Sequence, residues 1–220
     1  MTDRLPDAAP KDAAQPHTTR EDWLNLGLDT LIKHGIDRVK VQVMARDLNV
    51  SRSSFYWFFT DTADLHRQML NAWVEKNTAP IIAHAKSPQP DINRAILHVF
   101  ECWVTRVNFD PMLDVAVRLW ARRSAEVQAV VLDADQKRLT ALQEMFMHHD
   151  YPADEALVRA RVLYFTQIGQ YTLQIEEDMD TRMSRARLFA ETYSGRPMNP
   201  DDEEAFRDRA RQLVARHGEA

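Results

Sequence analysis

A chain of 220 residues, 45% of them hydrophobic and only 5 of them glycine, can bury a substantial core and favours an all-α fold. Because Cys102 is the one cysteine, the chain cannot form an intramolecular disulfide, which fits a reducing cytoplasm. No apolar run approaches the roughly 20 residues of a bilayer span, which excludes a transmembrane protein. The net charge of −5 would count against a nucleic-acid partner only if the charges were spread evenly along the chain.

The N-terminal part of the chain predicts an arm followed by a helix. Residues 1–17 contain Pro, Ala and Asp and lack the apolar segment of a secretory signal, so we expect them to be disordered. A helix should begin near Thr19, where Thr18-Thr19-Arg20-Glu21-Asp22 offers a capping-box pattern. Gly35 is a natural residue to end it.

Residues 41–48 and 52–59 predict two short helices joined by a tight turn. In the first, Val41, Met44, Ala45 and Leu48 share one face. Asn49 suits the left-handed conformation that such a turn requires. We expect the Ser51 hydroxyl to cap the second helix.

The second of these helices has a polar and basic beginning and an aromatic end. Arg52, Ser53 and Ser54 come first, whereas Phe55 and Phe59 are expected to anchor the helix in a core. This asymmetry is typical of a DNA recognition helix, whose first residues reach base edges. Within residues 31–60 the cations Lys33, Arg38, Lys40, Arg46 and Arg52 outnumber the anions Asp37 and Asp47, so the acidic excess lies elsewhere.

The segment from about residue 18 to 66 resembles the helix-turn-helix of the tetracycline-repressor (TetR) family of transcription regulators. The matching features are Gly35, the pair Met44-Ala45, the turn residues Val50-Ser51, the pair Phe55-Tyr56, Phe59 and Leu65. Three positions depart from the family pattern: Lys40 replaces a capping Thr or Ser, Asn49 replaces the turn Gly, and Thr62 replaces a Lys that lies near a phosphate.

The resemblance implies a ligand-responsive repressor that binds a double-stranded, roughly palindromic DNA operator as a homodimer. We expect Arg52 and Ser53 at base edges, because Arg can make a bidentate contact to guanine. Lys40, Ser51, Ser54 and Tyr56 are expected at phosphates, and Trp57 along the sugar-phosphate backbone. The alternative for the two aromatic residues is packing within the small module.

The remainder of the chain predicts a second, helical domain. We expect a long helix over 62–85, then helices at about 92–108, 111–123, 125–148, 153–176 and 181–193, and a mostly exposed helix over 201–217. We assign residues 18–63 to a three-helix DNA-binding domain, 64–194 to an effector-binding and dimerisation domain, and 195–220 to a linker and final helix.

The 153–176 helix carries two apolar seams, whereas a surface helix needs one. We expect one seam to face the protomer and the other to face a second copy, with a central place in the monomer core as the alternative. The predicted interface residues are Val131, Ala134, Leu142, Val158, Val162, Phe165, Gly169 and Thr172.

The resemblance also implies a small-molecule effector in the second domain. The candidate lining residues are His98, Trp103, Phe109, Met112, Trp120, Tyr164, Gln167 and Tyr171. Aromatic and Met residues at helical spacing form ordinary cores as well, so packing is the alternative. A flat or amphipathic molecule would suit this mixture.

We find no motif that indicates an enzyme, a cofactor or a metal. The chain lacks a Gly-rich phosphate loop, a nucleophile elbow and a His-Glu-x-x-His helix, so we expect no catalytic residues. The second alternative to a regulator is an interaction protein whose helix-turn-helix binds a protein partner.

Overall fold

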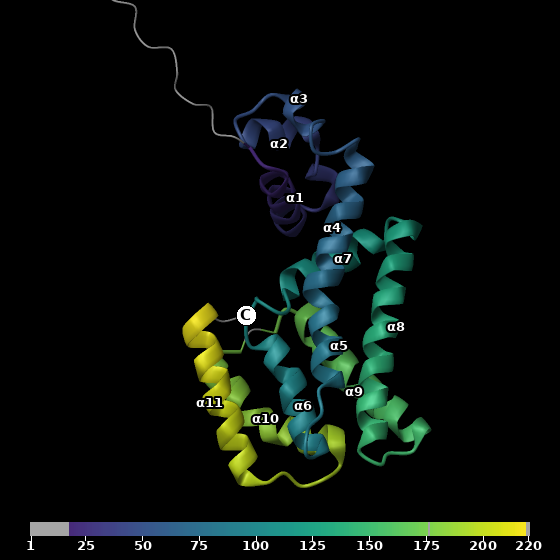
Figure 1. Ribbon diagram of the computed structural model, residues 1–220, viewed down its shortest axis with the longest axis vertical. Helices are drawn as coiled ribbons and strands as arrows, with labels where there is room; N and C mark the ends of the chain where they lie inside the picture. Colours follow the sequence, from purple (N-terminus) through teal and green to yellow (C-terminus); the bar gives the residue numbers. More distant parts are fainter. Residues whose placement is uncertain (1–17, 176, 219–220) are drawn as a thin grey trace, which may run out of the picture.

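The computed structural model describes residues 18–175 and 177–218, and the predicted N-terminal arm lies outside them. The described residues form helices and connecting turns without a strand, which confirms the all-α prediction (Figure 1). In chain order the helices are α1 (Arg20–His34), α2 (Val41–Asp47), α3 (Arg52–Phe55), α4 (Thr62–Asn77), α5 (Ala79–Lys86), α6 (Ile92–Phe100), α7 (Pro111–Ala121), α8 (Ala125–His148), α9 (Ala153–Thr172), α10 (Met179–Ser194) and α11 (Pro200–His217), with 3-10 turns η1 (Ile36–Arg38) and η2 (Glu101–Trp103).

The local signals at the N-terminal helices are confirmed. Asp22 accepts a hydrogen bond from the Thr19 backbone N–H at 2.7 Å, and the Asp22 N–H donates to the Thr19 hydroxyl at 3.2 Å, so the capping box is complete. Gly35 ends α1 with φ of 78°, and Asn49 has φ of 55° in the turn between α2 and α3. Both angles lie where an L side chain is disfavoured and Gly or Asn is tolerated.

Helix α3 differs from the predicted recognition helix in two respects. It is regular only over residues 52–55, because the N–H groups of Phe58 and Phe59 both bond the Phe55 carbonyl as the chain turns to bury the Phe59 ring. The predicted Ser51 cap is wrong. The Ser51 hydroxyl lies 2.7 Å from the Ser53 hydroxyl and makes no bond to a backbone N–H of α3.

The long helix predicted over 62–85 is also interrupted. It divides at Thr78 into α4 and α5, because Pro80 in the first turn of α5 has no N–H to continue the helical hydrogen bonds. The helix predicted over 92–108 likewise ends at Phe100 and continues as η2.

Two clusters of buried apolar residues stabilise the molecule. One unites α1–α4 with α7 and the first half of α8, through residues such as Trp23, Trp73, Val117 and Val131. The other contains α5, α6, η2, the second half of α8, and α9–α11. Packing therefore crosses the predicted boundary between residues 63 and 64, since α7 contacts both α1 and α4.

The final helix is more closely packed than its sequence predicts. Phe206 and Ala210 of α11 are buried against the second cluster, and Asp202 forms an ion pair with Arg94 of α6. Among the described helices, none has an apolar stretch sufficient to cross a membrane.

Candidate functional site

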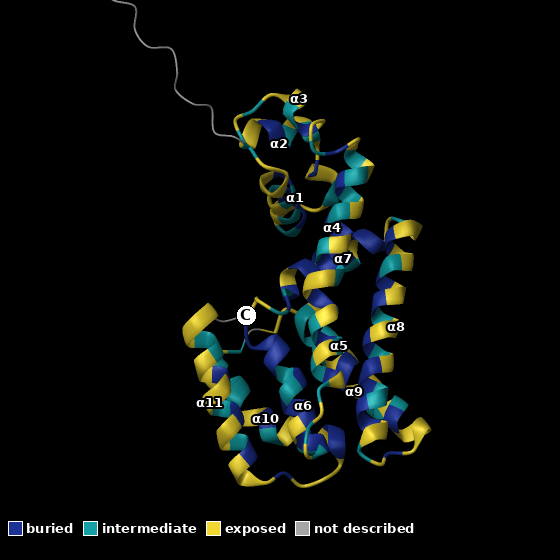
Figure 2. Ribbon diagram, in the orientation of Figure 1, coloured by how far each residue is buried: buried dark blue, intermediate teal, exposed yellow. Residues whose placement is uncertain are grey.

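The first turn of α3 lies at the tip of the molecule, away from α5–α11 (Figure 1). Figure 2 shows exposed residues along this tip. Six of the predicted DNA-binding residues are exposed and Ser54 is half-buried; the six are Lys40, Ser51, Arg52, Ser53, Tyr56 and Trp57. Trp57 is 80% exposed and Tyr56 is 61% exposed, so neither side chain is buried within the module.

The other side of α3 is held rigidly. The Phe55 ring packs edge-on against Trp23 of α1 at 5.2 Å and stacks on Phe59 at 5.1 Å, and all three residues are buried. Within the described part of the chain, Lys40, Arg46 and Arg52 form no ion pair with a carboxylate. The tip therefore presents cations and hydroxyls on an anchored base, which is what binding to a phosphate backbone and to base edges requires.

One face of α9 carries apolar side chains into solvent. Val158, Val162 and Phe165 are 59%, 48% and 56% exposed, whereas Ala156, Ala160, Leu163 and Tyr164 on the opposite face are buried. One face of α9 therefore packs on the protomer, whereas the face with Val158, Val162 and Phe165 does not. Leu188 of α10 is also 63% exposed.

The other predicted interface residues lie as follows. A Cβ on Gly169 would meet no atom within 4 Å, so the backbone is accessible there, and Thr172 is exposed. Val131, Ala134 and Leu142 were expected at the interface and are instead buried inside the protomer, at 6%, 1% and 0% exposure. They cannot meet a second chain because α8 packs that face against α5, α7 and α9.

Two adjoining cavities lie between η2, the N-terminus of α7, α9 and α10. The smaller, of about 50 Å³, is lined by residues that include Trp103 and Gln167, and the larger, of about 420 Å³, by residues that include Met112 and Tyr171. Gln170, Glu177 and Arg182 line both. Four of the eight predicted lining residues therefore surround these cavities.

Three buried polar atoms at these cavities lack a hydrogen bond of acceptable geometry from the protein: Trp103 Nε1, Gln167 Nε2 and Tyr171 Oη. Burial raises the pKa of Tyr171, so its hydroxyl stays protonated. Buried polar groups are nearly always hydrogen-bonded, so three such atoms at two adjoining cavities, Trp103 and Gln167 at the smaller and Tyr171 at the larger, indicate a place for a polar ligand or water.

The other four predicted lining residues lie elsewhere. Phe109 is buried and stacks on Tyr171 at 5.5 Å, behind the cavity wall. His98 contacts His84, Trp120 packs against His66 in the cluster that includes α1 and α4, and Tyr164 belongs to a buried polar network. Arg182 was missed as a lining residue because an Arg in a charged helix has no distinctive sequence signal.

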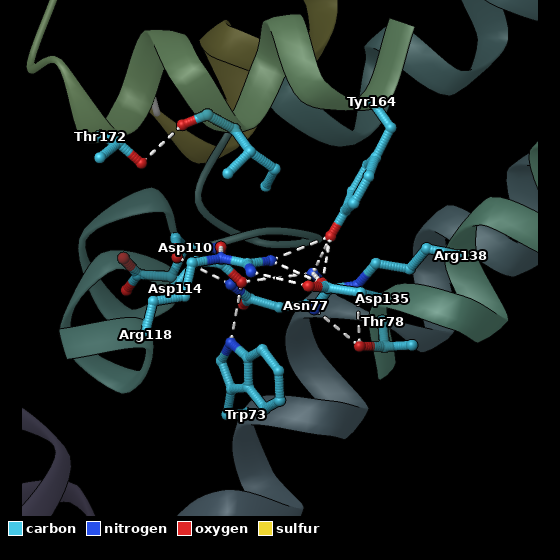
Figure 3. Close-up of polar contacts among 11 residues, drawn as sticks. Trp73, Asn77, Thr78, Asp110, Asp114, Arg118, Asp135, Arg138, Tyr164 and Thr172 are labelled. Carbon is cyan, nitrogen blue, oxygen red and sulfur yellow. Dashed lines mark hydrogen bonds and ion pairs between the residues drawn. The ribbon is translucent and has the colours of Figure 1, made fainter. Parts of the chain in front are cut away.

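The polar network lies where α4, α5, α7, α8 and α9 meet (Figure 3). Arg118 makes a bidentate pair with Asp135 at 2.7 and 2.8 Å and also binds Asp114 at 2.7 Å. Burial alone would raise the pKa of Asp135, but the hydrogen bond and charge of Arg118 keep it below its ordinary value.

Arg138 completes this network. Its side chain is fully buried and donates to Tyr164 Oη at 2.7 Å and to Thr78 Oγ1 at 2.7 Å, at the break between α4 and α5. Trp73 of α4 donates to Asp114 at 3.0 Å. The network therefore connects the helix that carries the α3 module to α9.

Comparison with known proteins rests on structure, since no protein-family model and no curated protein matches the sequence. A solved structure from Mesorhizobium loti MAFF303099, assigned to the TetR family of transcriptional regulators, matches with a TM-score of 0.57 and 11% identity, over 85% of this chain and 94% of that one. A transcriptional regulator from Rhodococcus sp. Rha1 matches with a TM-score of 0.52 and 16% identity, over 92% of this chain and all of that one, 100%. The chain therefore has the all-helical fold of a TetR-family transcriptional regulator.

Proposed function

We propose that this protein is a TetR-family transcriptional repressor that binds a palindromic DNA operator as a homodimer and is released by a small effector. The observation that carries the proposal is the exposed polar start of α3, with Arg52 and Ser53 outward and Phe55 and Phe59 anchored beneath. In a two-fold dimer, two such tips would enter successive major grooves.

Replacing Arg52 with alanine should weaken binding to an operator selected from random DNA by about 1 to 3 kcal/mol and relax the preference at one base pair, because a bidentate contact to guanine is lost. Fluorescence anisotropy with the selected operator and single-base variants measures both effects. Arg216→Ala, in the exposed last turn of α11, is the matched control and should bind as the wild type does. Unchanged affinity and base preference in Arg52→Ala would remove Arg52 from base recognition.

Salt dependence separates DNA from a protein partner. Because phosphate contacts release counterions, operator affinity should fall steeply and log-linearly with salt concentration. A helix-turn-helix bound to a protein through apolar contacts would not show this slope. The exposed cations Lys40, Arg46 and Arg52, and the scarcity of apolar side chains other than Trp57 and Tyr56 at this tip, favour DNA.

The effector site proposed here is the pair of adjoining cavities. Pro111 and Met112, at the start of α7, line the larger cavity, and α7 packs directly on α1 and α4. A ligand that displaces the start of α7 would therefore move the base of the recognition module. Such a ligand must prefer the conformation that binds DNA poorly, and DNA must then weaken ligand binding by the same factor.

The cavity chemistry favours an effector that accepts hydrogen bonds, in particular a planar carboxylate. Trp103 Nε1, Gln167 Nε2 and the Tyr171 hydroxyl are potential donors, and Arg182 and Arg106 are the cations that line the cavities. Phe100 and Phe189 supply aromatic walls. Glu177 is the only carboxylate that lines the cavities within the described residues, and it is paired with Arg185.

Trp103→Phe tests this site because it removes one N–H and keeps an aromatic ring. Aromatic carboxylates and their matched amides would be screened by thermal shift, and the best carboxylate measured by calorimetry. The variant should bind it about 10-fold or more weakly, as for a lost hydrogen bond to a charged group. Trp57→Phe, at the exposed tip, should bind normally. Equal binding by both variants would remove Trp103 from the effector site, and preference for the amides would contradict the carboxylate class.

A further inference from the structure

His84, His98 and Glu101 form a side-chain cluster that neither the DNA tip nor the effector cavities use. His84 lies on α5, His98 near the end of α6, and Glu101 begins η2. One candidate ligand atom from each residue lies within 4.8 Å of the other two. The two imidazole centroids are 4.4 Å apart. The side chains of His98 and Glu101 are 26% and 11% exposed, so the cluster is sheltered but accessible to an ion.

The hydrogen bond of His84 determines which nitrogen is available. His84 Nδ1 lies 2.8 Å from the backbone carbonyl oxygen of Pro80. A carbonyl oxygen can only accept, so Nδ1 carries the proton and Nε2 carries the lone pair. Histidines that bind metals usually donate their second ring N–H to a carbonyl or carboxylate in this way, which orients the ring.

Glu101 is oriented by a second contact. Arg209 of α11 donates to Glu101 Oε1 at 2.7 Å, and Glu101 Oε2 lies 3.2 Å from His98 Nδ1. Tetrahedral Zn²⁺ with bonds of about 2.0 Å separates its ligand atoms by roughly 3.3 Å. His98 Nδ1 and Glu101 Oε2 already have this separation, and Zn²⁺ would displace to solvent the proton that Nδ1 donates to Glu101.

We propose that His84, His98 and Glu101 bind a divalent transition-metal ion, with Zn²⁺ as the probe. Two imidazoles and one carboxylate suit Zn²⁺ and leave the fourth position for solvent, whereas Mg²⁺ and Ca²⁺ prefer oxygen ligands. The bound ion would join α5, which follows the α4–α5 break, to α6 and η2. In its absence the same residues form the His98–Glu101–Arg209 contacts described above.

The test uses the untagged full-length chain after removal of metals with a chelator. Calorimetry with Zn²⁺ should show one ion per chain, and Co²⁺ should give the visible absorption of a tetrahedral complex. His98→Ala should abolish both signals. His148→Ala should keep both signals. His148 is exposed, and its Nδ1 lies 2.7 Å from the backbone carbonyl oxygen of Glu144, four positions earlier, as His84 Nδ1 does with Pro80. It matches His84 in this contact but lacks a converging set of ligands among the described residues.

Glu101→Gln is a second variant that preserves shape, and it should weaken Zn²⁺ binding while circular dichroism shows an unchanged helical content. Absence of saturable Zn²⁺ binding in the wild type would overturn the proposal. Equal binding by the wild type, His98→Ala and Glu101→Gln would do the same, since the ion would then bind elsewhere. Neither outcome affects the DNA or effector proposals, which use other residues.

Discussion

Replacing Arg138 with methionine is expected to lower the free energy of unfolding by about 3 to 5 kcal/mol, the usual effect of removing one partner of a buried ion pair. The network contains two cations, Arg118 and Arg138, and two anions, Asp114 and Asp135. Methionine keeps much of the apolar stem but leaves one negative charge buried without compensation. It also removes the hydrogen bonds of Arg138 to Thr78 and Tyr164.

Chemical denaturation of the variant and the wild type measures this loss. The control is Arg123→Met, which removes an exposed ion pair with Asp37 and should cost at most about 1 kcal/mol. Adding Asp135→Asn to Arg138→Met restores the charge balance and should recover part of the stability. A loss in Arg138→Met no larger than that in Arg123→Met would show that the network contributes little.

Replacing Phe165 with glutamate is expected to dissociate the proposed dimer and to weaken binding to the proposed operator by about 100-fold or more, because one α3 tip alone loses the benefit of bivalent attachment. Phe165 is the largest exposed apolar side chain of the α9 seam, which also contains the exposed Val158 and Val162. A buried, unpaired carboxylate at such an interface is strongly unfavourable.

Sedimentation equilibrium would report the mass of the variant, and anisotropy its affinity for full and half operators. Leu132→Glu provides the control, since Leu132 is 60% exposed on α8 and is not part of the α9 seam. We expect it to leave the dimer intact. If Leu132→Glu dissociated the dimer and Phe165→Glu did not, the interface would lie on α8.

The helix-turn-helix was predictable because its determinants are local. The Thr19–Asp22 capping box and the positive φ of Gly35 and Asn49 each depend on neighbours within a few positions. The burial of Phe55 and Phe59 follows from their place at the apolar end of the helix, although Phe55 packs on the distant Trp23. The Ser51 cap was wrong because another hydroxyl, that of Ser53, lies close enough to compete for it. Sequence spacing alone does not decide between these two partners.

Contacts between distant segments were less predictable. Val131, Ala134 and Leu142 match an interface pattern, but α8 uses that pattern to pack within the protomer. Tyr164 was predicted to line the effector pocket, but its hydroxyl instead donates a hydrogen bond to Asp135, 29 positions away. Amphipathic spacing identifies which face of a helix is apolar, and it does not identify the neighbour that the face meets.

The sequence by itself determined the all-α class, most of the helix ends and the exposed basic start of the recognition helix, since capping, turn and periodicity signals act over a few residues. Only the tertiary structure decided the rest. It placed Arg138 from α8 beside the break at Thr78, where it donates two hydrogen bonds to the Thr78 hydroxyl, and it brought Trp103, Gln167 and Tyr171 to one pair of cavities. The physical reason is that burial and ion pairing depend on which elements meet in space, and many packings are compatible with the same helical pattern.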